Sequence, residues 1–130
     1  MRKRGQNVMT EPHRTDGEWQ SISPDIRRKV LSPGERMMSM LIDFKKGGYG
    51  AEHAHPHEQL GFVLSGKIRM KLGGEEKVVH AGEQIYVPGD VPHDVLALED
   101  SLVLETFTPL RHDLLEAAGI IIHKETGNQP

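Results

Sequence analysis

The segment from Gly47 to Gly66 reads GGYGAEHAHPHEQLGFVLSG and gathers three of the chain's eight histidines, at positions 53, 55 and 57. In an extended chain alternate side chains share one face, so His53 and His55 are expected about 7 Å apart along that face. Two imidazoles at this separation can converge on one metal ion, which binds histidine nitrogen at about 2.1 Å. Gln59 has the same parity and offers a carbonyl oxygen. The segment therefore predicts a β-strand that carries part of a metal site.

A further imidazole is expected from a distant part of the chain. His93 ends the tract PGDVPH and begins the strand-like run DVLAL, which makes it the best candidate. The alternative interpretation of the 53–57 cluster is a solvated, histidine-rich loop, because Pro56 interrupts any long strand. His57 follows this proline and is assigned a supporting or exposed role. The four isolated histidines are expected at the surface; they are His13, His80, His112 and His123.

The rest of the sequence predicts an all-β domain. From Ile22 onward, turn signals recur every eight to twelve residues, and the runs between them alternate apolar and polar residues with a period of two. In the run 37–44, Met38, Met40, Ile42 and Phe44 share one face. Other predicted strands are KIRMKL, QIYVP, DVLAL and SLVLETF, and Gly73–Gly74 supplies a hairpin turn. Only RHDLLEAAG, at 111–119, is predicted to be helical.

Length and composition narrow the class of protein. The 130 residues, 36% of them hydrophobic, suit one domain, predicted over 21–119 between a loose arm at 1–20 and a tail at 120–130. A net charge of −3 argues against nucleic acid as a partner. The absence of cysteine excludes disulfides and thiol catalysis. With no apolar run for a leader or a membrane span, we expect a cytoplasmic protein with no membrane partner.

The two histidine tracts resemble the two motifs of the cupins. Gly47, His53, His55, Gln59 and Gly66 match the spacing of the first motif, G(x)5HxH(x)3–4E(x)6G, with glutamine in the glutamate position.

The second motif is G(x)5PxGxxH(x)3N. Gly82, Pro88 and His93 match it, whereas Asp90 and Ala97 depart from it. The resemblance implies a small double-stranded β-helix, or jelly-roll barrel, with a short C-terminal helix. It also implies metal ligation by His53, His55, Gln59 and His93.

Glutamine in place of glutamate changes the expected charge of the site. Three neutral imidazoles and a neutral amide leave a divalent site formally at +2, whereas a glutamate ligand would make it +1. Such a site favours an anionic substrate oxygen and Lewis-acid chemistry over redox work. The expected cofactor is one divalent transition metal, namely Ni, Zn, Fe, Mn or Co, and this ligand set does not identify which one.

Beyond the two motifs the chain is similar to the KdgF-type pectin-degradation cupins. The matching segments are DIRRKVLS at 25–32, HAHPHEQLGFVLSGK at 53–67 and LETFTPLRHDLL at 104–115. This resemblance implies ring opening of 4,5-unsaturated monouronates to linear keto-uronates, a reaction on a small acidic sugar.

The same resemblance assigns catalytic roles to Glu105, Phe107 and Arg111, with glutamate at 105 where aspartate is more usual. Strand parity places Val103, Glu105 and Phe107 on one face. Arg111 could then hold a substrate carboxylate while Glu105 moves a proton. The alternative is a structural Glu105–Arg111 ion pair beside a core phenylalanine.

Three further points stay open at this stage. Another cupin enzyme for a small acid, such as a lyase or dioxygenase, is one alternative function, and a non-catalytic ligand-binding cupin is the other. Arg27 and Arg28 match the KdgF type, but by themselves they are typical of a solvated basic run, and so are Lys67, Arg69 and Lys71. A homodimer is expected, with IIIHK at 120–124 as a candidate edge-covering segment.

Overall fold

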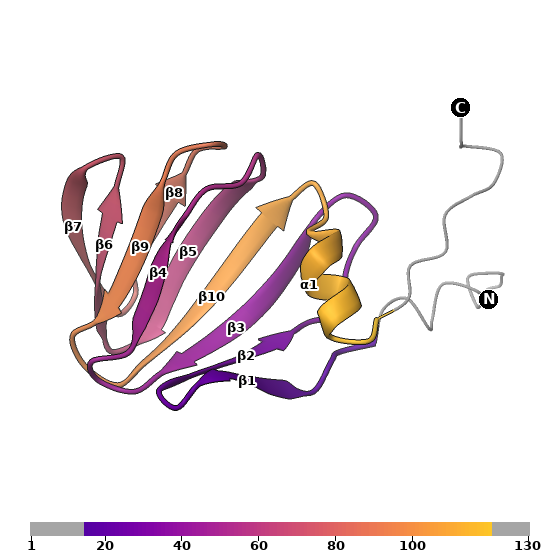
Figure 1. Cartoon of the computed structure of the whole chain (residues 1–130), viewed down its shortest axis with the longest axis horizontal. Coiled ribbons are helices and arrows are strands. Elements are labelled where there is room, and N and C mark those ends of the chain that lie inside the picture. The colour runs from indigo at the N-terminus through magenta and orange to yellow at the C-terminus, as the bar shows by residue number, and fades with distance from the viewer. Residues whose placement is uncertain (1–14, 121–130) are drawn as a thin grey trace, which may run out of the picture.

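Two antiparallel β-sheets face each other in the computed structural model, which describes residues 15–120 (Figure 1). The six-stranded sheet runs in the order β1 (Trp19–Ser23), β2 (Ile26–Val30), β3 (Met38–Phe44), β10 (Ser101–Thr108), β5 (Glu58–Ser65) and β8 (Gln84–Val87). The four-stranded sheet runs in the order β4 (Tyr49–His53), β9 (His93–Ala97), β6 (Lys67–Leu72) and β7 (Glu75–His80). One helix, α1 (His112–Ala117), follows β10. The all-β prediction is confirmed, and the arrangement is a jelly roll.

Strand parity decides which side chains enter the space between the sheets. On β10, the buried residues alternate with half-buried ones, and the buried set is Ser101, Val103, Glu105 and Phe107. The predicted face of β3 is also inward, with Met38, Met40 and Phe44 buried. Central strand β10 pairs with β3 on one side and β5 on the other. Glu105 is thus a carboxyl group in an otherwise mostly apolar row.

The apolar core consists of two clusters. The first fills the space between the two sheets and includes Val63, Ile68, Met70 and Val103. The second lies under α1, where Leu114 and Leu115 pack with Phe107 and with residues of β2 and β3. Burial of this helix face explains why a six-residue helix is stable here, since a helix this short is marginal on its own in water. In Figure 1, α1 lies beside the ends of β10 and β3.

The two ends of the barrel are built from different connections. We call the end that holds the turn at 65–66 and the loop 98–100 the glycine end. The end that holds residues 54–57, 88–92 and 109–111 is called the histidine end.

Gly66 is tightly enclosed at the glycine end. It has φ +89°, and a Cβ atom there would lie 2.3 Å from the Asp100 carbonyl oxygen. The Ser101 hydroxyl accepts from the Lys67 N–H at 2.9 Å and donates to the Glu99 carbonyl at 2.8 Å. The Lys46 N–H donates to the Asp100 carboxylate at 2.8 Å. These bonds join three connections that are far apart in the sequence.

The ends of several elements differ from those predicted from the sequence. The helix covers 112–117 rather than 111–119. Strand β1 begins at Trp19, so the last two residues of the predicted arm, 19–20, pair with β2. In the segment IIIHK only Ile120 is described, and it is buried; the rest of 120–124 lies outside the described residues. Between residues 15 and 120, no helix is long and apolar enough to cross a membrane.

Candidate metal and acid–base site

Three histidine rings meet at the histidine end of the barrel. His53 is the last residue of β4 and pairs in register with His93, the first residue of β9. His55 lies in the connection between β4 and β5 rather than on a continuous strand with His53. The ring centroids are 4.5 Å apart for His53–His93, 5.4 Å for His53–His55 and 5.1 Å for His55–His93. One nitrogen from each ring lies within 4.8 Å of the other two, so the triad could hold a metal ion.

The backbone orients all three rings in the same way. The Nδ1 atom of His53 lies 3.1 Å from the Ala51 carbonyl oxygen, and that of His93 lies 2.8 Å from the Val91 carbonyl oxygen. The Nδ1 atom of His55 lies 3.1 Å from the His57 carbonyl oxygen. A carbonyl accepts only, so each Nδ1 carries the hydrogen and each Nε2 presents a lone pair. Bonds of this kind fix the tautomer and direction of metal-binding histidines in proteins.

Two features of the cluster fit a cation. The Nε2 atom of His93 is buried and has no hydrogen-bond partner among the described residues. The Nε2 atom of His55 lies 3.0 Å from the side-chain oxygen of Gln59, whose amide group donates to Glu105. Two acceptor atoms therefore face each other inside the protein, which is unfavourable unless a positive charge lies beside them. The residues present fit a divalent ion with three imidazole nitrogens and one amide oxygen as ligands.

Burial favours the neutral form of two of the imidazoles, those of His55 and His93. It lowers the pKa of His55, and the positive charge of Arg111 lowers it further. Burial also lowers the pKa of His93. A neutral ring is the form that binds a metal ion, so the environment favours binding over protonation.

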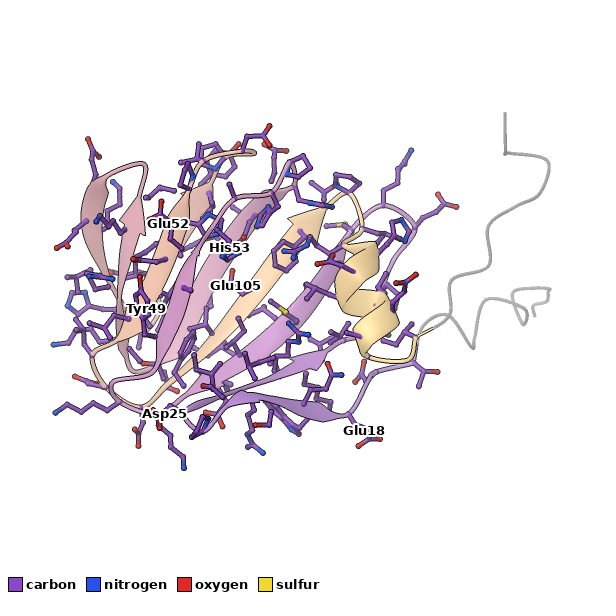
Figure 2. All side chains as sticks on the ribbon, in the orientation of Figure 1. Glu18, Asp25, Tyr49, Glu52, His53 and Glu105 are labelled. Carbon is purple, nitrogen blue, oxygen red and sulfur yellow. The ribbon has the colours of Figure 1, made fainter. Side chains whose placement is uncertain are left out.

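Glu105 lies next to the cluster, inside the barrel. It is 2% exposed, and burial raises its pKa to about 7, although the hydrogen bond from Gln59 and the charge of Arg111 act in the opposite direction. Gly61 on β5 leaves room for the carboxylate, because a Cβ atom there would lie 3.3 Å from Glu105 Oε1. In Figure 2, Glu105 lies on β10 and His53 nearer the histidine end. A carboxyl group with a pKa of about 7 can both take up and release a proton near neutral pH.

Phe107 and Arg111 complete the predicted set. The Phe107 ring lies 5.8 Å from that of His55, and the Arg111 guanidinium lies 5.1 Å from the Phe107 centroid. Arg111 pairs with Asp113 through contacts of 2.8 and 3.1 Å. The Glu105–Arg111 ion pair considered from the sequence is therefore not formed: Arg111 binds Asp113 and Glu105 binds Gln59.

One cavity of about 170 Å³ connects these groups between the sheets. It is lined by six of the seven predicted site residues, namely His53, Gln59, His93, Glu105, Phe107 and Arg111. His55 contacts it through Gln59 and Phe107. A wider and more open hollow lies along β7 and β8, but none of these residues lines it.

Comparison with known proteins agrees with this geometry. The sequence profile of the family described as Cupin domain matches residues 40–107, which is more than half of the chain. This chain belongs to the cupin family. Its matched region contains the triad, the amide and the buried carboxyl group.

Two relatives of this cupin carry the same name. The pectin degradation protein KdgF of Dickeya dadantii is 29% identical over 99 residues, which cover 75% of this chain and 90% of the relative. The solved structure of KdgF from Halomonas sp. is 35% identical, with a TM-score of 0.72 over 75% of this chain and 91% of that one.

A third relative shares the fold at a similar level. An RmlC-like cupin from Shewanella frigidimarina is 32% identical, with a TM-score of 0.71 over 75% of this chain and 88% of that one. The resemblance to KdgF-type cupins noted in the sequence is thus confirmed as a family relationship.

The cavity of this cupin also contains a residue that the sequence alone did not assign to it. Arg28 lines the cavity, whereas its neighbour Arg27 is exposed. The sequence held a signal for this: Arg28 has the strand parity of Ile26 and Val30, which are both buried, so the run IRRKV already indicates that Arg28 faces inward.

His57 lies beside the triad, with its ring centroid 5.6 Å from that of His55. His57 is half-buried and its Nε2 atom lies 3.2 Å from the Leu110 carbonyl oxygen, which suits the supporting role predicted for it. His80 and His112 are exposed, as predicted. His13 and His123 lie outside the described residues. Of the basic run on β6, Lys71 is exposed, whereas Arg69 is half-buried and pairs with Asp94 at 2.8 Å.

Proposed function

We propose that this cupin is a metal-dependent enzyme that opens the ring of 4,5-unsaturated monouronates to linear keto-uronates. The observation that carries the proposal is the contact between Gln59 and Glu105, which places a buried carboxyl group beside the histidine triad in one cavity. Similarity to two proteins named KdgF, one of them described as a pectin degradation protein, supports the choice of substrate.

The reaction is an isomerisation that needs one proton to move. Glu105 takes the proton of the anomeric hydroxyl, the bond between C1 and the ring oxygen breaks, and C1 becomes an aldehyde. The electron pair of that bond leaves as an enolate on C5, and Glu105 returns the proton to C4 to give the 5-keto product. No atom is gained or lost. A divalent ion held by His53, His55, Gln59 and His93 supplies Lewis acidity toward the oxygen atoms of the sugar when it is bound.

Two other side chains hold the substrate in this scheme. Arg111 lies in the same cavity and is already oriented by Asp113, so its guanidinium can bind the carboxylate of the uronate. Phe107 lies between Arg111 and His55 and offers an apolar surface to the sugar ring. Positioning of this kind brings the anomeric hydroxyl and C4 within reach of one carboxyl group.

The test is a spectroscopic assay on the full-length, metal-loaded protein. Mixing it with unsaturated galacturonate or guluronate monomers should cause a loss of ultraviolet absorbance, because the conjugated enol ether disappears. Treatment with a chelator should stop the loss, and adding the divalent ion back should restore it. Binding of the sugars without any absorbance change would instead indicate a non-catalytic binding protein. Consumption of dioxygen during the assay would favour a dioxygenase and contradict the proposal.

A further inference from the structure

Two adjacent arginines on β2 have opposite environments. Arg27 is exposed, pairs with Asp43 at 2.9 Å, and has its guanidinium carbon 4.2 Å from the centroid of the Trp19 ring. Arg28 is half-buried and lines the cavity that also contains Glu105 and Arg111. Because successive side chains of a strand point to opposite faces, the outward position of Arg27 requires the inward position of Arg28.

Within residues 15–120, Arg28 forms no ion pair with a carboxylate. Its Nε–H donates to the side-chain oxygen of Gln20 at 3.5 Å, which is a long contact. The carboxylates that line the same cavity have other partners. Glu105 accepts from Gln59, and Asp94 accepts from Tyr49 and Arg69. The two terminal nitrogens of Arg28 are thus left for a ligand.

Helix α1 orients both cavity arginines. The Gln20 amide donates to the carbonyl of Ala117 in the last turn, which turns the Gln20 oxygen toward Arg28. At the first turn, Asp113 holds Arg111 with two contacts. The Arg111 guanidinium is therefore directed before any ligand arrives, and that of Arg28 is held more loosely; preorganised groups bind with a smaller entropic cost.

The charges around the two arginines do not cancel. Burial lowers the pKa of Arg28, the nearby Asp113 raises it, and the charge of Arg111 lowers it to a smaller extent. One carboxylate, Asp113, thus lies close to two guanidinium groups, and it is already bonded to Arg111. A second anion near this pair would compensate the positive charge that remains.

We propose that Arg28 is the second arm of a two-arginine clamp that binds the substrate carboxylate together with Arg111. The clamp rests on the proposed function for the identity of the sugar, but its preference for an acid over a neutral sugar is a property of the cavity itself. Arg28 thereby selects uronates against their uncharged esters.

The experiment compares two neighbouring substitutions by calorimetry on the full-length, metal-loaded protein. The probes are galacturonate, which has no 4,5 double bond and cannot react, and its methyl ester, which has no charge. Arg28→Met should weaken galacturonate binding about 10- to 100-fold, as expected for loss of a charged hydrogen bond, and should leave binding of the ester unchanged. Arg27→Met is the matched control and should keep the wild-type affinity for both probes.

Further variants separate binding from folding. Arg28→Lys keeps the charge but loses the planar fork, so an intermediate loss for galacturonate is expected. If Arg28→Met does not fold, as judged by thermal denaturation, Arg28→Lys decides the question on its own.

Three results would overturn the clamp: wild-type affinity for galacturonate in either Arg28 variant, equal weakening for acid and ester, or no galacturonate binding by the native protein. Failure of the proposed function gives a different result. In that case the native protein would not turn over unsaturated uronates, but galacturonate binding would still depend on Arg28.

Discussion

At the glycine end of the barrel, buried polar groups are paired, whereas at the histidine end some are left open. The buried Ser101 hydroxyl and the exposed Asp100 carboxylate bind backbone groups of neighbouring turns. At the other end, His57 Nδ1 and His93 Nε2 are two of the three buried side-chain nitrogens without a partner among residues 15–120. Unpaired buried polar atoms cost stability, so they persist where a ligand can use them. One end is closed by its own hydrogen bonds, and the other leaves buried nitrogen atoms available to a ligand.

The largest expected effect is loss of metal in His93→Ala. The purified native protein should carry about one divalent transition ion per chain. Without His93 one imidazole is gone and the remaining ligands no longer surround the ion, so elemental analysis should find most of the metal missing. His80→Ala, which changes an exposed histidine paired with Glu83, should keep the full content. Full metal content in His93→Ala would contradict the assignment of His93 as a ligand, and with it the difference drawn between the two ends.

The second effect is loss of turnover in Glu105→Gln. The amide keeps the shape of the side chain but cannot exchange a proton, so kcat should fall about 10²- to 10⁴-fold. Metal content should stay at the native level, because Glu105 contacts the cluster through Gln59 only. A rate near that of the native enzyme, measured by the absorbance assay, would remove Glu105 from the mechanism.

The third effect tests the glycine end and concerns stability alone. Gly66→Ala places a methyl group against Asp100 and Ser101 and forces a non-glycine residue to a positive φ. We expect the free energy of unfolding to fall by roughly 3 kcal/mol, the sum of backbone strain and overpacking.

Gly47→Ala is the matched control, since Gly47 has the same φ of +89° but no neighbour within 4 Å of the added Cβ atom. In Gly47→Ala the free energy of unfolding should fall only by the backbone strain, about 1 kcal/mol. Chemical denaturation measures both variants. Equal losses in the two would mean that the close packing around Gly66 adds nothing.

The smallest effect on activity is expected for Gln59→Glu. The new carboxylate should bind the metal at least as tightly as the amide does. It removes the donor to Glu105, however, and adds a negative charge where an anionic substrate binds. We expect a roughly 10- to 100-fold lower kcat/KM, equal to about 1.4–2.8 kcal/mol. If Gln59→Glu keeps its metal and its kcat/KM is undiminished, the charge of the site does not select the substrate. The argument against dioxygenase chemistry would then no longer hold.

Much of the site follows from short-range pattern. The spacing of His53, His55 and Gln59 predicts that their side chains share one face, and His93 is found where a predicted turn meets a predicted strand. Parity also predicted that Val103, Glu105 and Phe107 share one face of β10, and the structure shows that this face is the inward one. These features need no knowledge of which strands pair.

Contacts between distant strands did not follow from the sequence. The hydrogen bond from Gln59 to Glu105 joins residues 46 positions apart, and it depends on the pairing of β5 with β10. The parity of Arg28 with Ile26 and Val30 indicates its inward face, but that it shares a cavity with Glu105 and Arg111 depends on how β2 pairs with β3. The pairing of Arg111 with Asp113 is local, but only the structure shows that it replaces an ion pair with Glu105.

The strand pairing that gathers the histidine rings would also couple metal binding to the folding equilibrium. His53 and His93 come together only through the pairing of β4 with β9, so the unfolded chain offers no comparable set of ligands. A ligand that binds only the folded state stabilises it by mass action, by about 2.7 kcal/mol at a free concentration 100 times its Kd. The melting temperature of this protein should therefore vary with the supply of free divalent ion, and scarcity of that ion would shorten the lifetime of the folded chain.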